Sequence, residues 1–269
     1  MNLILIQPHE PDGEGRICLS DYRAEHIRHV LKAELGKTLR IGLLNGPKGT
    51  GTVEKVCCKE ILLRCEFEEK IPPRPNVELL LALPRPKVMK RLWAQLAALG
   101  VRRIILTNAE KVERCYFDSH VLDPDFYTAR LIEGLQQAGD TNLPEVQIVR
   151  QLKPFLEDEL DADFPNIGPE HSERGPDAFA VGQRPQGVAK KLLADPSGEF
   201  NLFQTLENKK PQRCCLAIGP EGGWTPYELE LFTAHGFQVF NAGSRILRTD
   251  TACIALLSLL TLLSGANEK

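Results

Sequence analysis

From residue 78 onward, apolar segments of strand length alternate with segments of helical length, and this alternation constrains the fold more than any other feature. In the first repeat, a strand at 78–83 leads to an amphipathic helix at 87–99, a stop at Gly100 and a strand at 101–106. Strands joined by helices pair in parallel, so the sequence predicts an α/β fold with an open parallel sheet. The six expected strands are 78–83, 101–106, 145–149, 192–195, 214–219 and 237–241. Further helices are expected at 124–137 (capped by Asp123), at 226–234 and after 248.

The first seventy or so residues have a different pattern, with short strands and turns in place of the strand–helix alternation. One helix is expected from Asp21 to about residue 33, with Ser20 or Asp21 as its cap. The strands are expected at 3–6, 39–44, 51–56 and 61–67, with turn chemistry at 45–49. This pattern is typical of a small β-barrel. The proline-rich segment 71–75 excludes helix and central strand, so we expect two domains, 1–72 and 73–269.

Composition excludes a chain that coats nucleic acid along its whole surface. Hydrophobic residues make up 42% and charged residues 26%, which are ordinary globular values, and the net charge is −3. Any RNA contact must therefore come from a local patch. The stretch 74–103 carries seven basic residues against Glu78 alone, and it either holds an RNA backbone or is a solvated helix face and loop. We expect the acidic stretch 157–161 to be solvated and 164–186 to be a surface insertion.

The eight cysteines form no CxxC pair and no cluster with zinc-ligand spacing, so no metal site is expected. The adjacent pairs 57–58 and 214–215 lie in apolar runs and are typical of small buried hydrophobes. The apolar segment 252–263 is shorter than the about 20 residues that a membrane span needs, and the start of the chain is too short an apolar run for a signal peptide. We therefore expect a protein of a reducing compartment, the cytoplasm, without a membrane anchor.

Two strand-end loops carry the chemistry. The segment 218–225, IGPEGGWT, follows an apolar strand, and its glycines let backbone N–H groups approach a ligand closely, although such a turn can be purely structural. Open α/β sheets bind ligands at the carboxyl ends of their strands, where this loop lies. The segment 241–252, NAGSRILRTDTA, is also a strand-end loop before a helix, with Thr249 or Asp250 as a possible cap. Its apolar Ile246 and Leu247 are unusual in a loop and suggest folding over a ligand or through the core.

Taken together, these two segments resemble the RsmE-type branch of the SPOUT (trefoil-knotted) RNA methyltransferases. The resemblance extends over most of the chain: residues 26–31 with Asn45 and Gly46 are similar to that family's PUA-like barrel, and 99–101, 137–139 and 143–145 to its central stretches. It implies a knotted parallel sheet, a homodimer, S-adenosylmethionine as cofactor, and methylation at N3 of a uridine in small-subunit ribosomal RNA. The implied cofactor-binding residues are Ala194, Asp195, Ile218, Gly219, Glu221, Gly222, Gly223, Asn241, Ala242, Gly243, Ser244, Ile246 and Leu247.

The chain also departs from the family pattern. A common Gln-Ser-Gly-Arg motif is here Gln137-Ala138-Gly139-Asp140, and Ala98 stands where a glutamate is common. The alternatives are therefore a degenerate SPOUT/PUA-like RNA-binding protein without catalysis, the same class of enzyme acting on another RNA, and a different α/β enzyme that binds a nucleotide phosphate. No lysine follows the glycines as in a P-loop, and there is no GxGxxG, which disfavours the last.

The residue types in these loops suit methylation of a uracil nitrogen, which requires removal of a proton and stabilisation of charge on the uracil oxygens. Arg248 is the first candidate for stabilising that charge, with a salt bridge to Glu221 or Asp250 as the structural alternative. Glu221 is a candidate base or cofactor-orienting group, or else a cap of the helix that starts near Thr225. The candidate RNA contacts are Arg28, Arg114 and Gln137.

Overall fold

The computed structural model describes residues 2–57, 59–164, 189–206, 211 and 213–263. The expected insertion at 164–186 therefore lies outside the described residues, apart from Phe164. The chain divides into two compact units. The first unit comprises Met1–Pro75, Trp93–Gly100 and Pro124–Pro144, and the second comprises Asn76–Leu92, Val101–Asp123 and Glu145–Lys269.

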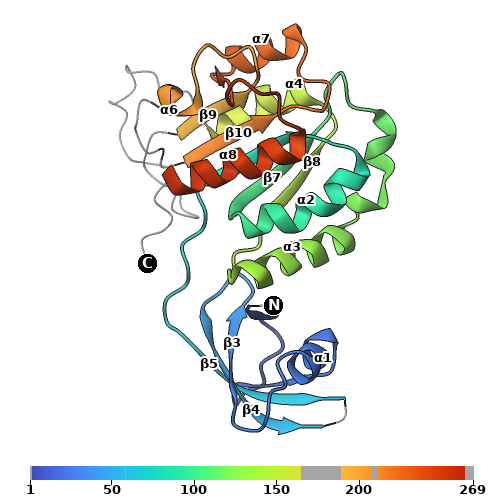
Figure 1. Cartoon of the computed structure of the whole chain (residues 1–269), viewed down its shortest axis with the longest axis vertical. Helices are drawn as coiled ribbons and strands as arrows, with labels where there is room; N and C mark the ends of the chain where they lie inside the picture. The colour runs from blue at the N-terminus through green and yellow to red at the C-terminus, as the bar shows by residue number, and fades with distance from the viewer. Residues whose placement is uncertain (1, 58, 165–188, 207–210, 212, 264–269) are drawn as a thin grey trace. The chain divides into compact units, whose positions relative to one another are not determined.

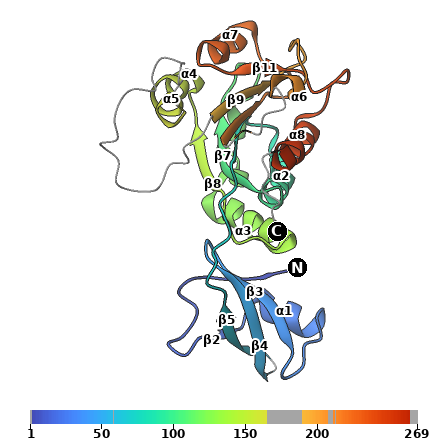
Figure 2. The ribbon, with the colours of Figure 1, turned by 90° about the vertical axis from the view of Figure 1, so that its left-hand side faces the viewer.

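A five-stranded sheet of order β1-β3-β4-β5-β2 curls around the core of the first unit (Figure 2). Its strands are β1 (Ile4–Ile6), β2 (Arg16–Leu19), β3 (Thr38–Leu43), β4 (Lys48–Val56) and β5 (Ile61–Phe67). β1 pairs with β3 in parallel, and the other pairs are antiparallel. Apolar residues alternate along the strands, so one face of the sheet is buried. That face and α1 (Tyr22–His29) enclose a core that includes Ile6, Ile17, Ile27, Ile41 and Leu63.

The structure corrects three expectations for this unit. Asp21 caps α1 as expected, but the helix ends at His29, because Lys32 takes a positive φ of 46° and Ala33 N–H closes back onto the Ile27 carbonyl at 3.0 Å. The turn is confined to residues 44–46, where Asn45 has a φ of 58°, so Lys48 and Gly49 already lie in β4. The four-residue strand β2 was not expected at all.

The first unit also contains α3 (Pro124–Ala138) and the carboxyl-terminal part of α2 (Pro86–Ala98). The two helices approach closely at Gly134, where an added Cβ would lie 2.1 Å from the Ala94 carbonyl oxygen. After α3, the Asp140 carboxylate accepts hydrogen bonds from the backbone N–H groups of Thr141 and Asn142 at 2.6 and 3.2 Å. Asp140 therefore fixes the turn that leads out of α3.

The second unit contains a six-stranded, fully parallel sheet of order β11-β9-β10-β6-β7-β8 (Figure 1). The strands are β6 (Val77–Ala82), β7 (Val101–Thr107), β8 (Glu145–Val149), β9 (Ala189–Ala194), β10 (Arg213–Ile218) and β11 (Gln238–Phe240). All six expected strands are present, and the prediction of a parallel α/β sheet is confirmed. The nearly continuous burial of β6 and β10 is typical of strands covered on both faces.

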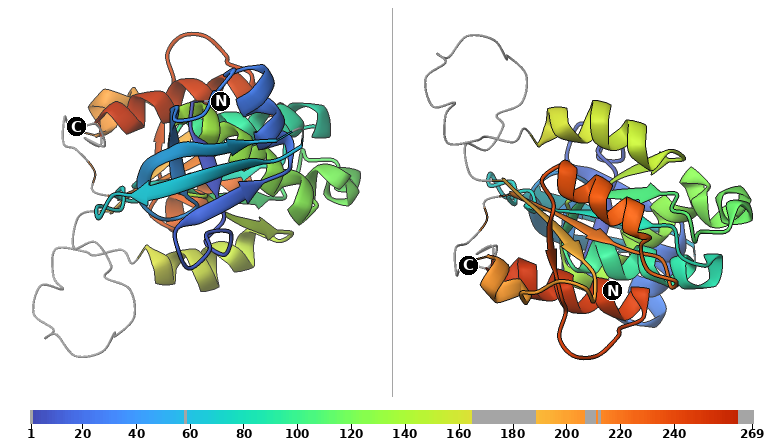
Figure 3. Two further views of the ribbon diagram at one scale, coloured as in Figure 1. Left: turned by 90° about the horizontal axis from the view of Figure 1, so that it is seen from below. Right: turned by 90° about the horizontal axis from the view of Figure 1, so that it is seen from above.

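Helices cover both faces of this sheet. α8 (Thr249–Leu263) lies on one face, and the helical segment α4 (Leu152–Pro154), η3 (Phe155–Leu160) and α5 (Asp161–Asp163) lies on the other (Figure 3). The expected helix 226–234 is α7 (Pro226–Ala234). The remaining short elements are η1 (Arg114–Asp118), η2 (His120–Leu122) and α6 (Leu202–Thr205). No helix in the described part of the chain is long and apolar enough to cross a membrane.

Charged residues near the amino ends of the strands are buried and paired, which corrects two expectations. Glu78 is fully buried and accepts from the Nε atoms of Arg103 and Arg213, both at 2.8 Å. The basic stretch 74–103 is therefore not one free surface. The expectation that the acidic stretch 157–161 is solvated is wrong for Asp161. This residue pairs with the buried Lys191 and with His235, at 2.7 Å each.

The described cysteines are free thiols. Cys214 and Cys215 are fully buried in β10, as expected, and burial raises the pKa of Cys215 to about 12. Of the other pair, Cys57 is only half-buried and Cys58 lies outside the described residues. The thiols in β10 therefore behave as small core residues.

Candidate functional site

A pocket of about 270 Å³ opens at the carboxyl ends of β9, β10 and β11. Three loops form it: the residues after β9, the glycine-rich loop 219–225 after β10, and the loop 241–248 between β11 and α8. Parallel strands bring their carboxyl ends to the same edge of a sheet, so loops far apart in sequence meet there. This is the edge at which the sequence predicted the site.

Most of the predicted cofactor-binding and catalytic residues line this pocket, and three do not. Those that line it are Ala194, Asp195, Ile218, Gly219, Glu221, Gly223, Ala242, Gly243, Ile246, Leu247 and Arg248. Gly222, Asn241 and Ser244 are not among the lining residues. The sequence reasoning missed Pro196, Pro220, Trp224, Arg245, Thr249, Ala252 and Leu256. Ala252 and Leu256 are four residues apart in α8, so the helical period could have placed both on the pocket side.

Trp224 makes the inner wall of the glycine-rich loop. The residue is 5% exposed and packs edge-on against Phe232 of α7, with ring centroids 4.8 Å apart. Its indole lies directly against Gly219, where an added Cβ would come within 3.1 Å of Nε1. A side chain at 219 would therefore press on the buried indole, which would have to shift by a few tenths of an ångström.

Gly222 belongs to the outer side of the same loop. Its carbonyl accepts from Lys111 Nζ at 2.7 Å, and an added Cβ would meet the Lys111 side chain at 2.9 Å. Gly223 has a φ of 69°, which reverses the chain toward the pocket. A side chain at 222 would thus press on a flexible lysine, whereas one at 219 would press on the buried indole.

The glycine-rich loop is fixed at its end by the start of α7. Thr225 and Glu228 form a reciprocal capping box, and the Glu228 carboxylate also accepts from Glu110 N–H at 2.8 Å. Glu221 does not cap this helix, which excludes that alternative. The exposed Glu221 carboxylate instead accepts from the Arg85 backbone N–H at 3.4 Å.

The loop 241–248 is much more exposed. Asn241 anchors its start, because the side chain donates to the Gly198 carbonyl at 2.8 Å and accepts from Gly243 N–H at 3.2 Å. Residues 242–246 are all exposed, and Ile246 is 88% exposed. Leu247 is half-buried. Neither Ile246 nor Leu247 therefore threads the core, and both line the pocket.

Of the two expected caps, Asp250 accepts from the Thr251 N–H at 2.9 Å in the first turn of α8. Thr249 is the first residue of α8, and its hydroxyl donates to the Gly219 carbonyl at 3.2 Å, which links the two pocket loops. Asp250 pairs with Arg91 at 3.3 Å. The exposed Arg248 makes no ion pair with Glu221 or Asp250 within the described residues, so the expected structural alternative for Arg248 is not found.

The three candidate RNA-contact residues lie outside the pocket. Arg28 lies on α1 and is half-buried, and Gln137 is exposed near the end of α3; both belong to the first unit. Arg114 is the exposed first residue of η1 in the second unit. Their proposed role is untested by this geometry. Within the described ranges, no group of three or more His, Cys, Asp or Glu side chains comes together as a metal site would require.

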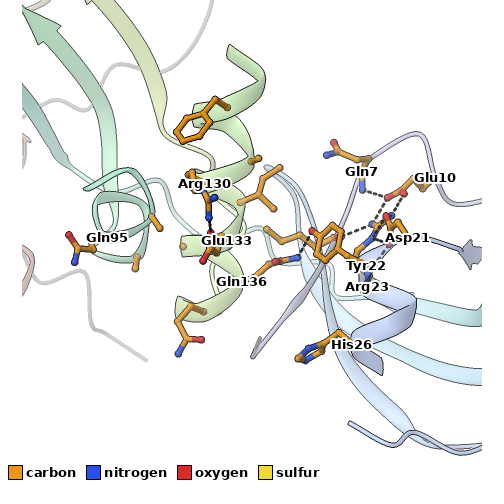
Figure 4. Close-up of a pocket in the computed structure, with 18 residues that line it drawn as sticks. Gln7, Glu10, Asp21, Tyr22, Arg23, His26, Gln95, Arg130, Glu133 and Gln136 are labelled. Atoms are coloured by element: carbon orange, nitrogen blue, oxygen red, sulfur yellow. Dashed lines mark hydrogen bonds and ion pairs between the residues drawn. The ribbon is translucent and has the colours of Figure 1, made fainter. Parts of the chain in front are cut away.

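A second, larger cavity of about 1050 Å³ lies inside the first unit, between α1 and the helices α2 and α3 (Figure 4). Its charges are satisfied locally. The buried Arg23 donates to the Leu5 carbonyl and to Glu10, and this hydrogen bond from Arg23 holds the pKa of Glu10 below its usual value. Arg130 pairs with Glu133 at 2.7 Å. A cavity in which each charge is compensated offers no net attraction for a phosphate.

Comparison with known proteins identifies the family. The model of the RNA methyltransferase domain matches residues 72–261. The chain belongs to this family. It is 28% identical over 260 residues to the ribosomal RNA small subunit methyltransferase E of Treponema pallidum, which covers 95% of this chain and 88% of that protein. The predicted membership of the RsmE-type branch is thereby confirmed.

Two solved structures share the fold of this chain. The structure of a ribosomal RNA small subunit methyltransferase E from Neisseria gonorrhoeae bound to S-adenosyl methionine superposes with a TM-score of 0.72 at 19% identity, over 98% of both chains. A protein from Legionella pneumophila, solved in complex with the bound cofactor SAM, superposes with a TM-score of 0.68 at 24% identity, over 97% of both chains. At these identities the likeness concerns the fold.

Proposed function

We propose that this protein is an S-adenosylmethionine-dependent methyltransferase that acts on N3 of a uridine in small-subunit ribosomal RNA. The observation that carries the proposal is the pocket at the carboxyl edge of the parallel sheet, lined by both loops of the methyltransferase-like motif. The names of the relatives support an rRNA of the small subunit as substrate, and two structural neighbours contain the cofactor.

The residues of the pocket fit S-adenosylmethionine. The inner wall combines the apolar Ile218, Trp224 and Leu256, each 5% exposed or less, with backbone groups at the glycines. Polar groups surround the mouth, where Asp195, Glu221 and Arg248 lie. The pocket volume of about 270 Å³ lies just below the about 300–1,000 Å³ that is usual for small-ligand pockets. The proposed binding residues are those predicted from the sequence, without Gly222, Asn241 and Ser244, which lie off the lining.

The bound cofactor supplies an electrophilic methyl group on a sulfonium. The chain must then orient the uracil, remove the N3 proton and stabilise the charge that spreads onto the two ring oxygens. Arg248 is exposed at the pocket mouth and has no carboxylate partner among the described residues, so its guanidinium is available to these oxygens or to the adjacent phosphate. Glu221 lies on the same rim and is the candidate acceptor of the N3 proton.

The remaining parts of the proposal concern RNA and assembly. We place RNA contacts on a barrel domain of residues 1–72, through Arg28, and on Arg114 and Gln137. The order β11-β9-β10-β6 puts the last strands beside strands from earlier in the chain, which is compatible with a trefoil knot. A homodimer is proposed from the resemblance to the RsmE-type enzymes. The cytoplasm is the proposed location.

A non-catalytic RNA-binding protein is the second candidate, and it rested on Asp140 at the position of a common arginine. Asp140 fixes the turn after α3 through Thr141 and Asn142, in the first unit, and does not line the pocket. The pocket loops themselves are intact. The substitution therefore does not speak against cofactor binding.

The deciding experiment uses small ribosomal subunits that lack the methyl mark and S-adenosylmethionine with a labelled methyl group. After incubation, the RNA is digested and its nucleosides are identified by mass spectrometry. We expect labelled 3-methyluridine. Label on another nucleoside would keep the enzyme class and reject the target atom. Absence of label, with cofactor binding still measurable by calorimetry, would move the substrate to another RNA, and absence of both would favour the non-catalytic protein.

A further inference from the structure

Trp224 carries a buried donor without a partner, directly at the pocket. The side chain is 5% exposed, and its Nε1 atom is buried with no hydrogen-bond partner among the described residues. Buried N–H groups are nearly always bonded, because an unmade hydrogen bond costs about 1–3 kcal/mol. Trp224 and Gly219 both line the pocket, and a Cβ added at Gly219 would lie 3.1 Å from Nε1 and 3.2 Å from the neighbouring ring atoms Cδ1 and Cε2, over the face of the indole. An orphan donor at this position therefore indicates a ligand that supplies the acceptor.

The surroundings of Nε1 define the acceptor's chemistry. Ile218 and Leu256 make the neighbouring wall apolar, and both are 3% exposed. A carboxylate would need several donors or a cation to be buried there, and Arg245 and Arg248 are exposed residues of the other loop. A flat heterocycle buries its faces against apolar side chains and needs a single donor in its plane for a ring nitrogen. The inner wall thus suits a heteroaromatic ring with an unprotonated nitrogen.

We propose that Trp224 recognises the adenine ring of the cofactor, through a hydrogen bond from the indole Nε1–H to a ring nitrogen. This proposal rests on the proposed function, which supplies the cofactor. Trp224 is a binding residue in this proposal and takes no part in proton transfer. Phe232 holds the indole in place edge-on, so the donor direction is set before the ligand arrives.

A comparison of ligands and variants tests the hydrogen bond. Calorimetry measures S-adenosylhomocysteine and its 1-deaza, 3-deaza and 7-deaza forms against the full-length protein and Trp224→Phe. The phenylalanine keeps an aromatic ring against Phe232 and removes the donor. We expect Trp224→Phe to bind the parent ligand about tenfold more weakly. One deaza ligand should bind the unaltered protein about tenfold more weakly than the parent ligand does. The variant should bind that deaza ligand and the parent ligand with equal affinity, because the hydrogen bond is already absent.

The matched control is Trp93→Phe. Trp93 is the other tryptophan, fully buried against Tyr127 of α3, and it belongs to the first unit rather than to the pocket. Its substitution should leave every affinity unchanged. A second measurement needs no pocket variant: the indole N–H signal of Trp224 in ¹⁵N NMR, assigned with Trp93→Phe, should move on binding the parent ligand and not on binding the sensitive deaza ligand.

The outcomes distinguish failure of the Trp224 hydrogen bond from failure of cofactor binding. Equal affinities of Trp224→Phe and the unaltered protein for the parent ligand would overturn the tryptophan's role and leave the cofactor site standing. The tryptophan's role would also be overturned if each deaza ligand lost affinity by the same factor on the unaltered protein and on Trp224→Phe. No binding of the parent ligand by the unaltered protein would instead reject the cofactor, and the role of Trp224 with it.

Discussion

At the amino ends of the strands in the six-stranded sheet, Glu78 is fully buried between Arg103 and Arg213, whereas at the carboxyl ends Arg248 is exposed and unpaired within the described chain. The buried charges follow the register of the sheet: Glu78 lies beside Arg103 of β7 and Cys215 of β10, and Cys215 lies beside Lys191 of β9. One end of the sheet compensates its charges internally, and the other presents them at a pocket mouth.

This difference separates charges that maintain the fold from charges that are available for chemistry. A buried ion tolerates removal of its partner poorly, because the remaining charge is desolvated and unpaired. An exposed arginine at a pocket rim contributes little to stability and can reach a ligand. Substitutions at the two ends should therefore affect different observables, stability at one and catalysis at the other.

The largest effect is expected from Glu78→Gln. Loss of the carboxylate leaves Arg103 and Arg213 facing each other with little solvent, and the free energy of unfolding should fall by about 3–5 kcal/mol. Urea denaturation followed by circular dichroism measures this loss. The control is Glu133→Gln, which breaks the exposed pair with Arg130 and should cost less than about 0.5 kcal/mol. Equal costs for both variants would erase the proposed difference between buried and exposed charge.

Arg248→Ala should act on the rate and not on the fold. If its guanidinium stabilises charge on the uracil, the methylation rate should fall at least about a hundredfold, the scale of one lost charge-stabilising group. Cofactor affinity and the unfolding midpoint should stay nearly unchanged. Arg248→Lys keeps the charge and loses the planar guanidinium. Its methylation rate should lie between those of the unaltered protein and Arg248→Ala. A parallel loss of cofactor affinity would show that Arg248 belongs to cofactor binding.

Asp161→Asn should give the smallest effect, with a distinct pH signature. Burial raises the pKa of Asp161, but hydrogen bonds from Lys191 and His235 outweigh it and lower the pKa below 3.8. A carboxyl group whose pKa is lowered in the folded state stabilises the fold at pH values above its pKa in the unfolded chain. This stabilisation is lost as the pH falls through the folded-state pKa. At pH 7 the variant should lose about 2 kcal/mol. Below about pH 4 its stability should fall less steeply than that of the unaltered protein; identical acid profiles would contradict the ion pair.

The sequence predicted the parallel sheet because strand-like apolar segments alternate with helical segments, and all six expected strands are present. It failed where the signal was short or the partner distant. The strand β2 has four residues and pairs only through β5, forty-odd positions later. The stretch 157–161 was expected to be a solvated acidic face, because nothing local reveals that Lys191 and His235 reach Asp161.

The pocket was predictable as a set of loops and less so as a set of side chains. Motif resemblance indicated the correct strand ends, but it could not tell that Gly222 faces Lys111 while Gly219 faces the indole. Those directions depend on the φ angles of the turn and on packing against α7. Trp224 belongs to the motif, but the sequence could not predict its role, since an unpartnered donor is a property of three-dimensional packing.

The capping box of α7 fastens one wall of the pocket to the loop after β7, through Glu228 and Glu110, while residues 242–246 of the other wall are exposed. Passage of a ligand into or out of the pocket should therefore proceed by displacement of the exposed wall. Substitutions there that change only how readily the wall opens would speed or slow association and dissociation by the same factor. Residence time could then vary among related chains while the dissociation constant stays fixed.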